Sequence, residues 1–287
     1  MKKRISLLLV MVMSLAMMLT GCSSSNNASS NASSGSSSSN SDDEFRVGME
    51  CGYAPFNWTQ SDDSNGGVKI QGNDEYVGGY DVQIAQKIAD GLGKKLVIVK
   101  TEWDGLVPAV QSGKIDAIIA GMSPTAERKK TIDFTDVYYT SDLVMVVKKG
   151  GKYENATKLS DFKGATITGQ LNTFHYTVID QIEGAKKDTA MDNFPAMRVA
   201  LESGKIDGYV SERPEGVSAT AANDNFAMVE FAKGQGFKTS AEDTAIAVGL
   251  AKDSPLKDKI NKILAGISED ERKDLMDQAI KNQPASK

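Results

Sequence analysis

The stretch IDAIIAGMSPTAERKKTIDF, residues 115–134, decides the interpretation of this chain. Its opening residues, apolar at 115 and at 117–120, are typical of a buried parallel strand, because such strands are covered on both faces. Ser123 followed by Pro124 then predicts a helix start, since serine is a favourable N-cap and proline is tolerated in the first turn.

A helix start would make this stretch a candidate anion site. Free backbone N–H groups and the positive end of the helix dipole attract an anion. Gly121 lets the backbone approach a ligand, and Arg128 can hold a carboxylate through two parallel hydrogen bonds. The alternative is that Arg128 is a surface charge beside Glu127, Lys129 and Lys130. This stretch alone leaves both interpretations open.

The start of the chain predicts export. It reads MKKR, continues with an apolar run over residues 5–19 and reaches LTGC at residues 19–22. A positive end, a short apolar core and small residues before a cleavage site describe a secretory signal, with a membrane helix as the alternative. LTGC resembles a bacterial lipobox, which implies removal of the signal peptide 1–21 and attachment of a lipid to Cys22. Such a cysteine holds a protein at a membrane surface without spanning it.

Residues 23–41 are almost entirely Ser, Asn, Ala and Gly, which cannot bury enough apolar surface to fold. We therefore predict a disordered tether over residues 22–44, before a folded part long enough for one large or two medium lobes. Once Cys22 carries lipid, Cys51 is the only remaining thiol, which excludes an internal disulfide and a cysteine metal cluster. We predict no metal site.

The charge of the mature chain argues against nucleic acid as a partner. The formal net charge is −5, and removal of the three cations Lys2, Lys3 and Arg4 with the signal makes it −8. A nucleic-acid-binding domain normally carries a basic face, so we predict no nucleic acid partner.

Periodicity predicts an α/β order in the first half of the chain. Strands are expected at 45–49, 96–99 and 115–120, helices at 80–92 and 103–112, a loop at 50–58 and an irregular excursion or small hairpin at 59–79. Strands that alternate with helices predict a parallel sheet with right-handed crossovers.

The second half predicts a similar series and contains a repeat. Strands are expected at 143–147, 165–168 and 244–250, and helices at 173–182, 193–203, 254–266 and 268–281. AVQSGKID, from Ala109, and ALESGKID, from Ala200, share the pentapeptide SGKID between the end of a helix and a strand. The pentapeptide indicates either a serviceable helix-to-strand turn or two lobes of similar build.

Ligands of open α/β sheets collect outside the carboxyl ends of the strands. If two lobes face each other, the loops at 121–128 and 211–213 open onto one cleft. Arg128 would then suit a carboxylate and Glu212 an ammonium group. The alternative for Glu212 is an exposed acid paired with a neighbouring arginine.

Three blocks of the sequence carry a family resemblance. GYDV at 79–82, AGMS at 120–123 leading to Glu127-Arg128, and IDFT at 132–135 resemble the polar amino acid solute-binding proteins of bacterial ABC importers, solute-binding protein family 3. The resemblance covers 45–287. It implies the type II periplasmic-binding-protein fold, in which two Rossmann-like α/β lobes are joined by a two-strand hinge with the ligand cleft between them. The implied lobes are 45–140 plus 241–287 and 141–240.

The resemblance also implies a binding site. Arg128, with help from Gly121 and Ser123, would hold the α-carboxylate of an amino acid. Thr173 would add a donor from the other lobe. Glu212 would receive the α-ammonium group, at a position where the family usually has the shorter Asp.

Three further residues would surround the ligand's side chain. Tyr53 and Trp103 would sandwich it, and Glu50 would meet its far end. A guanidinium between two rings gains cation–π attraction and a charge-assisted hydrogen bond to the acid. We therefore expect a basic ligand such as arginine, lysine, ornithine or histidine, with a neutral one such as glutamine as the alternative. Leu171, where the family has glycine, departs from the pattern near Thr173.

The resemblance implies a monomeric, extracytoplasmic binding lipoprotein of a Gram-positive cell membrane, which delivers a free amino acid to an ABC permease and needs no cofactor. The competing class is an enzyme of the same fold, such as a cyclohexadienyl dehydratase, and a surface sensor is a third. His175 is the only histidine, and we expect it on a helix surface or in packing. We predict a binding protein and no enzyme.

Overall fold

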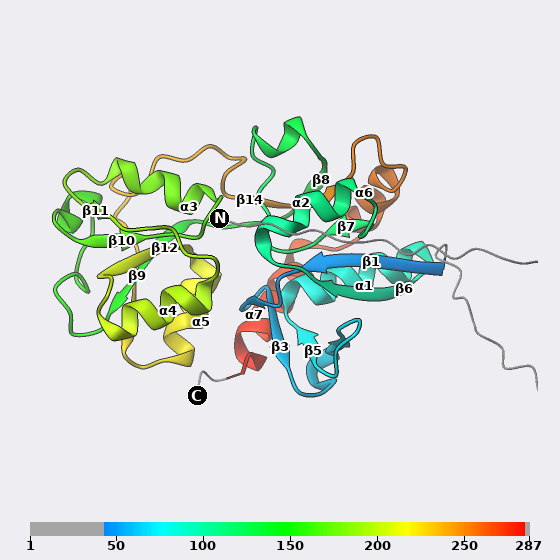
Figure 1. Ribbon diagram of the computed structural model, residues 1–287, viewed down its shortest axis with the longest axis horizontal. Helices are drawn as coiled ribbons and strands as arrows, with labels where there is room; N and C mark the ends of the chain where they lie inside the picture. Colours follow the sequence, from blue (N-terminus) through cyan, green and yellow to red (C-terminus); the bar gives the residue numbers. More distant parts are fainter. Residues whose placement is uncertain (1–42, 285–287) are drawn as a thin grey trace, which may run out of the picture. The chain divides into compact units, whose positions relative to one another are not determined.

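The computed structural model describes residues 43–284 of the chain (Figure 1). Cys22, the predicted signal peptide and almost all of the predicted tether lie outside these residues. No helix within 43–284 combines the length and apolar character that a membrane span requires.

The first lobe is built on a sheet with the strand order β6-β1-β7-β14-β8. Its strands are β1 (Glu44–Met49), β6 (Lys95–Lys100), β7 (Ala117–Ile118), β8 (Asp133–Thr140) and β14 (Ala245–Leu250). Strand β1 pairs in parallel with β6 and β7, as the alternating pattern predicts, whereas β14 runs antiparallel to β7 and β8. This lobe therefore has a parallel core extended by antiparallel strands.

Four helices accompany the first sheet, in cyan and teal and, near the C-terminus, in orange and red in Figure 1. They are α1 (Tyr80–Leu92), α2 (Trp103–Gln111), α6 (Lys257–Ala265) and α7 (Glu269–Asn282). Helix α1 contacts both α6 and α7, so the end of the chain completes the first lobe. Ser268 caps α7 by accepting a hydrogen bond from the backbone of Glu271, as the Ser-x-x-Glu spacing predicts.

The second lobe has the strand order β11-β10-β12-β9-β13 and is green to yellow in Figure 1. Its elements are β9 (Leu143–Lys148), β10 (Thr166–Thr168), β11 (Lys186–Lys187), β12 (Gly208–Glu212), β13 (Phe226–Val229), α3 (Phe174–Thr177), α4 (Phe194–Ser203) and α5 (Arg213–Ala222), with short 3-10 turns at Leu159–Phe162 and Val178–Gln181. Strands β10, β11 and β12 are parallel, and β9 is antiparallel to β12. Where a helix was predicted at 173–182, the structure has only the four-residue helix α3 followed by the 3-10 turn Val178–Gln181.

The repeated SGKID has the same hydrogen bonds in both lobes. Asp116 exchanges backbone and carboxylate hydrogen bonds of 2.8 Å with the backbone of Arg46, and Asp207 exchanges bonds of 2.8 Å with the backbone of Thr166. The glycine of each copy has a positive φ, 73° at Gly113 and 79° at Gly204. The pentapeptide is therefore a helix-to-strand turn whose aspartate ties one strand to the next, once in each lobe.

The predicted helix start at Ser123 is wrong. Residues 122–125 are irregular, and only a 3-10 turn, Arg128–Lys130, follows. Ser123 Oγ donates to the carbonyl of Asp243 at 2.9 Å, and the carbonyl of Met122 accepts from Ala247 at 3.1 Å. These contacts with the returning chain hold the segment extended, so tertiary pairing overrides the local capping preference.

Residues 50–79, predicted as a loop and an excursion or hairpin, form a small antiparallel sheet of four strands. These are β2 (Gly52–Tyr53), β3 (Asn57–Gln60), β4 (Val68–Lys69) and β5 (Tyr76–Gly78), with a 3-10 turn at Ser64–Gly66. The isolated bridge between Ile70 and Ile98 joins this segment to the edge strand β6.

Two adjacent segments connect the lobes. The chain leaves the first lobe after β8 and returns to it before β14, and Ser141 donates a backbone hydrogen bond of 2.9 Å to the carbonyl of Thr244. The predicted α/β fold of two lobes is confirmed, whereas the predicted lobe boundaries at residues 140 and 240 stay a prediction.

We expect Gly79→Ala to be strongly destabilising, because Gly79 has φ 125° and ψ 176° at the start of α1. A Cβ there would lie 2.3 Å from the carbonyl oxygen of Phe56. Strain and overpacking together should lower the free energy of unfolding by about 3 kcal/mol or more, measured by chemical denaturation.

Gly72→Ala is the matched control, because Gly72 has φ 74° and open space around the new Cβ. It should cost only about 1 kcal/mol. Equal losses in the two variants would contradict the steric argument.

Candidate functional site

Arg128 lies at the 3-10 turn after β7 and is half-buried. Its guanidinium donates to the carbonyls of Ser123 at 2.9 Å and Asn172 at 3.2 Å, and lies 5.0 Å from the ring centroid of Trp103. Burial lowers the pKa of Arg128 to about 10, which the charge of Glu212 opposes, so the group stays cationic at neutral pH. Within residues 43–284 it forms no ion pair with a carboxylate, which leaves a positive charge available to a ligand.

Glu212 ends β12 at the start of α5, and its side chain is 1% exposed. One carboxylate oxygen, Oε2, accepts a hydrogen bond from the hydroxyl of Tyr53 in the first lobe. The other, Oε1, lies 3.6 Å from Nε2 of His175. A deeply buried acid therefore lies where residues of both lobes meet.

Glu50 follows β1 and is 6% exposed. It accepts a hydrogen bond from Nε2 of Gln170, at 3.2 Å to Oε2, and the carbonyl of Gln170 accepts from the hydroxyl of Thr173 at 2.7 Å. Burial raises the pKa of Glu50 to about 7, although the bond from Gln170 opposes this rise. Within residues 43–284, Gln170 is the side chain that donates to this acid.

Gly121 and Tyr53 are in close contact. Gly121 has φ 62°, and a Cβ at this position would lie 2.6 Å from Cε1 of the Tyr53 ring. Only glycine therefore lets the ring approach this loop. Two residues later, the carbonyl of Ser123 accepts a hydrogen bond from Arg128, and the hydroxyl of Ser123 donates to the carbonyl of Asp243.

The eight predicted binding residues form three groups of contacts in the structure. Arg128 contacts Trp103 and Ser123, and Tyr53 contacts Glu212 and adjoins Gly121, while Glu50 and Thr173 share Gln170. Tyr53 and Trp103 do not stack on each other. The ring of Tyr53 stacks on Phe194, with centroids 4.4 Å apart, and lies 4.8 Å from Phe56. Their role as a sandwich for a ligand stays a prediction.

Several residues of this region were missed by the sequence analysis. They are Asn57, Asp81, Tyr138, Gln170, His175 and Phe194. Asp81 lies in the GYDV block, and that signal could have identified it. The prediction that His175 lies on a helix surface or in packing missed its contact with Glu212, because at 5% exposure it is buried beside that acid.

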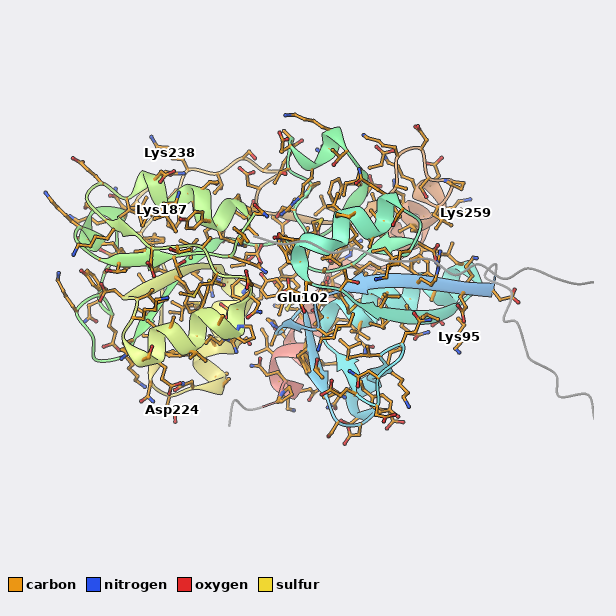
Figure 2. All side chains as sticks on the ribbon, in the orientation of Figure 1. Lys95, Glu102, Lys187, Asp224, Lys238 and Lys259 are labelled. Atoms are coloured by element: carbon orange, nitrogen blue, oxygen red, sulfur yellow. The ribbon has the colours of Figure 1, made fainter. Side chains whose placement is uncertain are left out.

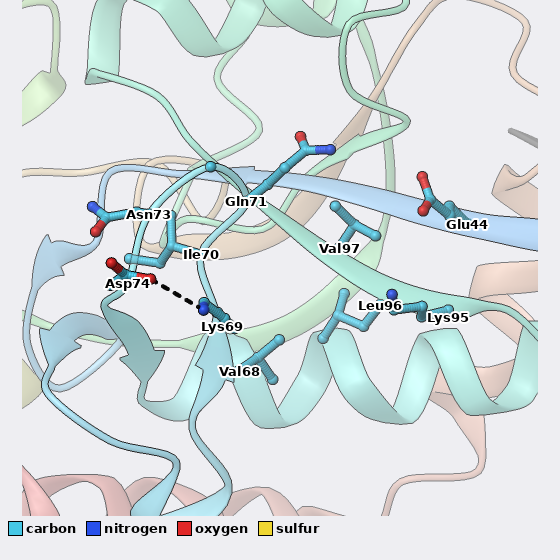
Figure 3. A pocket seen from close by; sticks show the side chains of 11 residues that line it. Glu44, Val68, Lys69, Ile70, Gln71, Asn73, Asp74, Lys95, Leu96 and Val97 are labelled. Carbon is cyan, nitrogen blue, oxygen red and sulfur yellow. Dashed lines mark hydrogen bonds and ion pairs between the residues drawn. The ribbon is translucent and has the colours of Figure 1, made fainter. Parts of the chain in front are cut away.

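The acids of the site, Glu50 and Glu212, are buried. Charged side chains of the surface such as Lys95, Lys238 and Lys259 instead extend into solvent (Figure 2). A separate pocket of about 620 Å³ lies at the edge strand β6, between residues 68–74 and 95–97 (Figure 3). Its ion pair, Lys69–Asp74 at 3.3 Å, is exposed and contributes little energy. None of the predicted binding residues lines this pocket. In the part of the chain that the structure describes, no group of three His, Cys, Asp or Glu side chains could hold a metal ion.

Two α/β lobes joined by adjacent crossing segments, with buried charges where they meet, define the type II periplasmic-binding-protein fold. The chain belongs to the bacterial extracellular solute-binding proteins, family 3, whose family model matches residues 45–281.

Named relatives extend this assignment. The arginine-binding extracellular protein ArtP of Bacillus subtilis (strain 168) is 28% identical over 223 residues, which cover 76% of this chain and 78% of the relative. The structure is also similar to an amino acid ABC transporter substrate-binding protein from Streptococcus pneumoniae bound to L-arginine, with a TM-score of 0.73, 28% identity and coverage of 83% of this chain and 94% of that one. An ancestral arginine-binding protein bound to glutamine has a TM-score of 0.66 and 29% identity over 82% of this chain and 97% of its own.

We expect the raised pKa of Glu50 to make stability depend on pH. The ordinary pKa is 4.5 and the folded value about 7, so the folded protein retains a proton that the unfolded chain loses between these values. Stability should therefore fall as pH rises through this window, by about 3 kcal/mol from Glu50. Asp81, whose pKa burial also raises to about 7, acts in the same direction.

Denaturation of Glu50→Gln at pH 5 and pH 8 tests this expectation. Relative to the unmodified protein, the variant should be more stable at pH 8 than at pH 5, because glutamine cannot ionise. Glu127→Gln, whose side chain is 80% exposed, is the control and should show no such change. A difference between Glu50→Gln and the parent that is the same at both pH values would contradict the assignment.

Proposed function

We propose that this protein captures an L-amino acid with a basic side chain, arginine above all, between its two lobes and delivers it to an ABC permease. Arg128 holds the α-carboxylate, with Gly121, Ser123 and Thr173 beside it. Glu212 receives the α-ammonium, and Glu50 receives the cationic end of the side chain next to Tyr53 and Trp103.

The charges of the buried groups support a basic ligand. Arg128 is cationic and, among the described residues, its guanidinium donates hydrogen bonds only to neutral carbonyls, while Glu50 and Glu212 are acids of 6% and 1% exposure. One cation and two acids complement a ligand with one carboxylate and two positive groups. Buried charges are tolerated only when they are paired, so such a ligand neutralises the site.

The observation that carries the proposal is the buried Glu50. Its pKa of about 7 means that near neutral pH the site holds the carboxylate at the edge of ionisation. A cation bound beside Glu50 would stabilise the charged form and provide the partner that Gln170 alone does not.

A neutral amino acid such as glutamine is the second candidate. Glu50 can stay protonated at a pKa of about 7 and hydrogen-bond an amide without a charge, and an arginine-binding relative has been observed with glutamine. The two candidates differ in how binding depends on pH.

We propose a single-chain binding protein and no enzyme. The matched family consists of solute-binding proteins, and both halves of the site come from one chain. We further propose that Cys22 carries the lipid and that the segment between Cys22 and β1 tethers the protein to the outer face of a Gram-positive cell membrane.

A thermal-shift screen of the purified protein against the twenty amino acids and ornithine tests the proposal. The protein is first unfolded and refolded to remove any ligand retained during purification. A ligand that binds only the folded state raises the unfolding midpoint, so arginine should give a clear rise. No rise with any amino acid would overturn the proposed function.

Arg128→Ala examines the carboxylate assignment. We expect it to weaken arginine binding at least a hundredfold, because a charged bidentate partner is lost from a shielded site. Lys130→Ala is the control, since Lys130 is 68% exposed and only two residues away. Calorimetric titration should separate the two variants, and equal affinities would reject Arg128 as the carboxylate partner.

We expect the affinity for arginine to rise with pH up to about pH 7 and then level off. Below the pKa of Glu50 the ligand must displace a proton, which weakens binding about tenfold per pH unit. The Kd at pH 6 should therefore be about ten times that at pH 8, and Glu50→Gln should flatten this profile. A glutamine-binding site would show little pH dependence, and a flat profile for arginine in the unmodified protein would contradict the role of Glu50.

A further inference from the structure

Three buried polar atoms without a hydrogen-bond partner meet at one place among residues 43–284. They are Nδ1 and Nε2 of His175 and Oε1 of Glu212. The two side chains are 6% and 1% exposed, and Nε2 lies 3.6 Å from Oε1. Buried polar groups are nearly always hydrogen-bonded, so a group of unpartnered atoms needs an explanation.

Backbone geometry positions the histidine at this point. Gly169 follows β10, and a Cβ there would lie 2.8 Å from the backbone nitrogen of Tyr176 and 2.9 Å from the backbone of His175. Only glycine allows this approach, which brings α3 against the strand end. The ring of His175 then lies 4.4 Å from that of Phe174 and 6.2 Å from that of Phe194.

We propose that His175 is a further ligand-binding residue, whose unprotonated ring nitrogen accepts an N–H from the ligand's α-ammonium while Glu212 Oε1 accepts a second. This inference rests on the proposed function, because it names a partner within the same site. It predicts that two side chains, His175 and Glu212, together select for a free α-amino group.

Two of the three ammonium donors find acceptors in this arrangement. An ammonium group has three donors, a carboxylate oxygen accepts, and a neutral imidazole has one bare nitrogen that accepts. Because Nε2 and Oε1 are 3.6 Å apart, one ligand nitrogen can lie about 2.9 Å from both. Glu212 Oε2 is occupied by the hydroxyl of Tyr53, so Oε1 and the histidine are the acceptors left for a ligand.

The competing explanation is a structural ion pair between an imidazolium and Glu212. A protonated ring would donate directly to Oε1 and bring the two atoms to about 2.8 Å, the usual length of a charge-assisted bond. The separation of 3.6 Å exceeds this length. An imidazolium would also compete with the ligand's ammonium for Oε1. In that case, replacing His175 would not weaken ligand binding.

The test compares L-arginine with 5-guanidinopentanoate, which lacks only the α-amino group, by calorimetric titration at pH 8. His175→Phe replaces the ring among neighbouring aromatic residues without an acceptor, and His175→Gln retains one. We expect His175→Phe to weaken arginine binding about tenfold to a hundredfold, and His175→Gln to recover part of this loss. The affinity for 5-guanidinopentanoate should change less than threefold in either variant.

Thr177→Ala, an exposed change on the same short helix, is the matched control and should bind as the parent does. Unfolding midpoints without ligand show whether each variant folds. Equal arginine affinities for the parent and His175→Phe, or equal losses for both ligands, would overturn the proposal. If the analogue binds too weakly to titrate, the affinities for arginine decide. A decrease in the order parent, His175→Gln, His175→Phe supports the proposal, and any other order rejects it. Failure of the parent to bind any amino acid would instead reject the proposed function.

Discussion

The part of the site in the first lobe depends on the hydrogen bonds that the buried carboxylate of Asp81 accepts. It is fully buried and accepts hydrogen bonds from the hydroxyl of Tyr138 at 2.8 Å and the amide of Asn57 at 3.0 Å. The same Asn57 accepts at 2.8 Å from the backbone of Cys51, which has a left-handed φ of 58° directly after Glu50. Burial raises the pKa of Asp81 to about 7 in spite of its hydrogen bonds. Asp81, in the first turn of α1, is thus hydrogen-bonded directly to β8 and β3, and through Asn57 to the turn that follows Glu50. These bonds explain the acid in the GYDV block.

The proposed binding residues partly satisfy one another through hydrogen bonds. Tyr53 donates to Oε2 of Glu212 and Gln170 donates to Glu50, whereas Oε1 of Glu212 has no hydrogen-bond partner among the described residues. The guanidinium of Arg128 donates hydrogen bonds only to carbonyls within the described residues. These incomplete pairs favour a ligand that brings the missing charges, and they penalise a ligand that lacks one, because a buried group would then stay unpaired. Specificity in such a site comes from the cost of leaving those groups without partners.

The sequence predicted the elements whose signals are local. Helix α1 and the two SGKID turns follow from apolar spacing and glycine positions, and the structure contains both. The helix expected after Ser123 failed because its evidence was also local, whereas the carbonyl of Met122 pairs with Ala247, far away in sequence. The family resemblance singled out Arg128 and Glu212 as ligand-binding candidates, and their roles stay a prediction. No local pattern could reveal that His175 is buried beside Glu212, because this depends on the approach of α3 to β10 at Gly169.

The contacts that close the site also explain why the lobes must separate for a ligand to enter. Tyr53, in the first lobe, stacks on Phe194 and donates to Glu212, both in the second. If the proposed roles hold, a guanidinium against the face of Tyr53 and an ammonium beside Glu212 would both need space that these contacts restrict. Because the lobes are joined by two adjacent segments, bonded from Ser141 to Thr244, a rotation about those segments can separate Tyr53 from both partners without breaking either sheet. A ligand that then bridges the lobes would add charged hydrogen bonds to Arg128 and to Oε1 of Glu212, and this added interaction is what would favour the closed form.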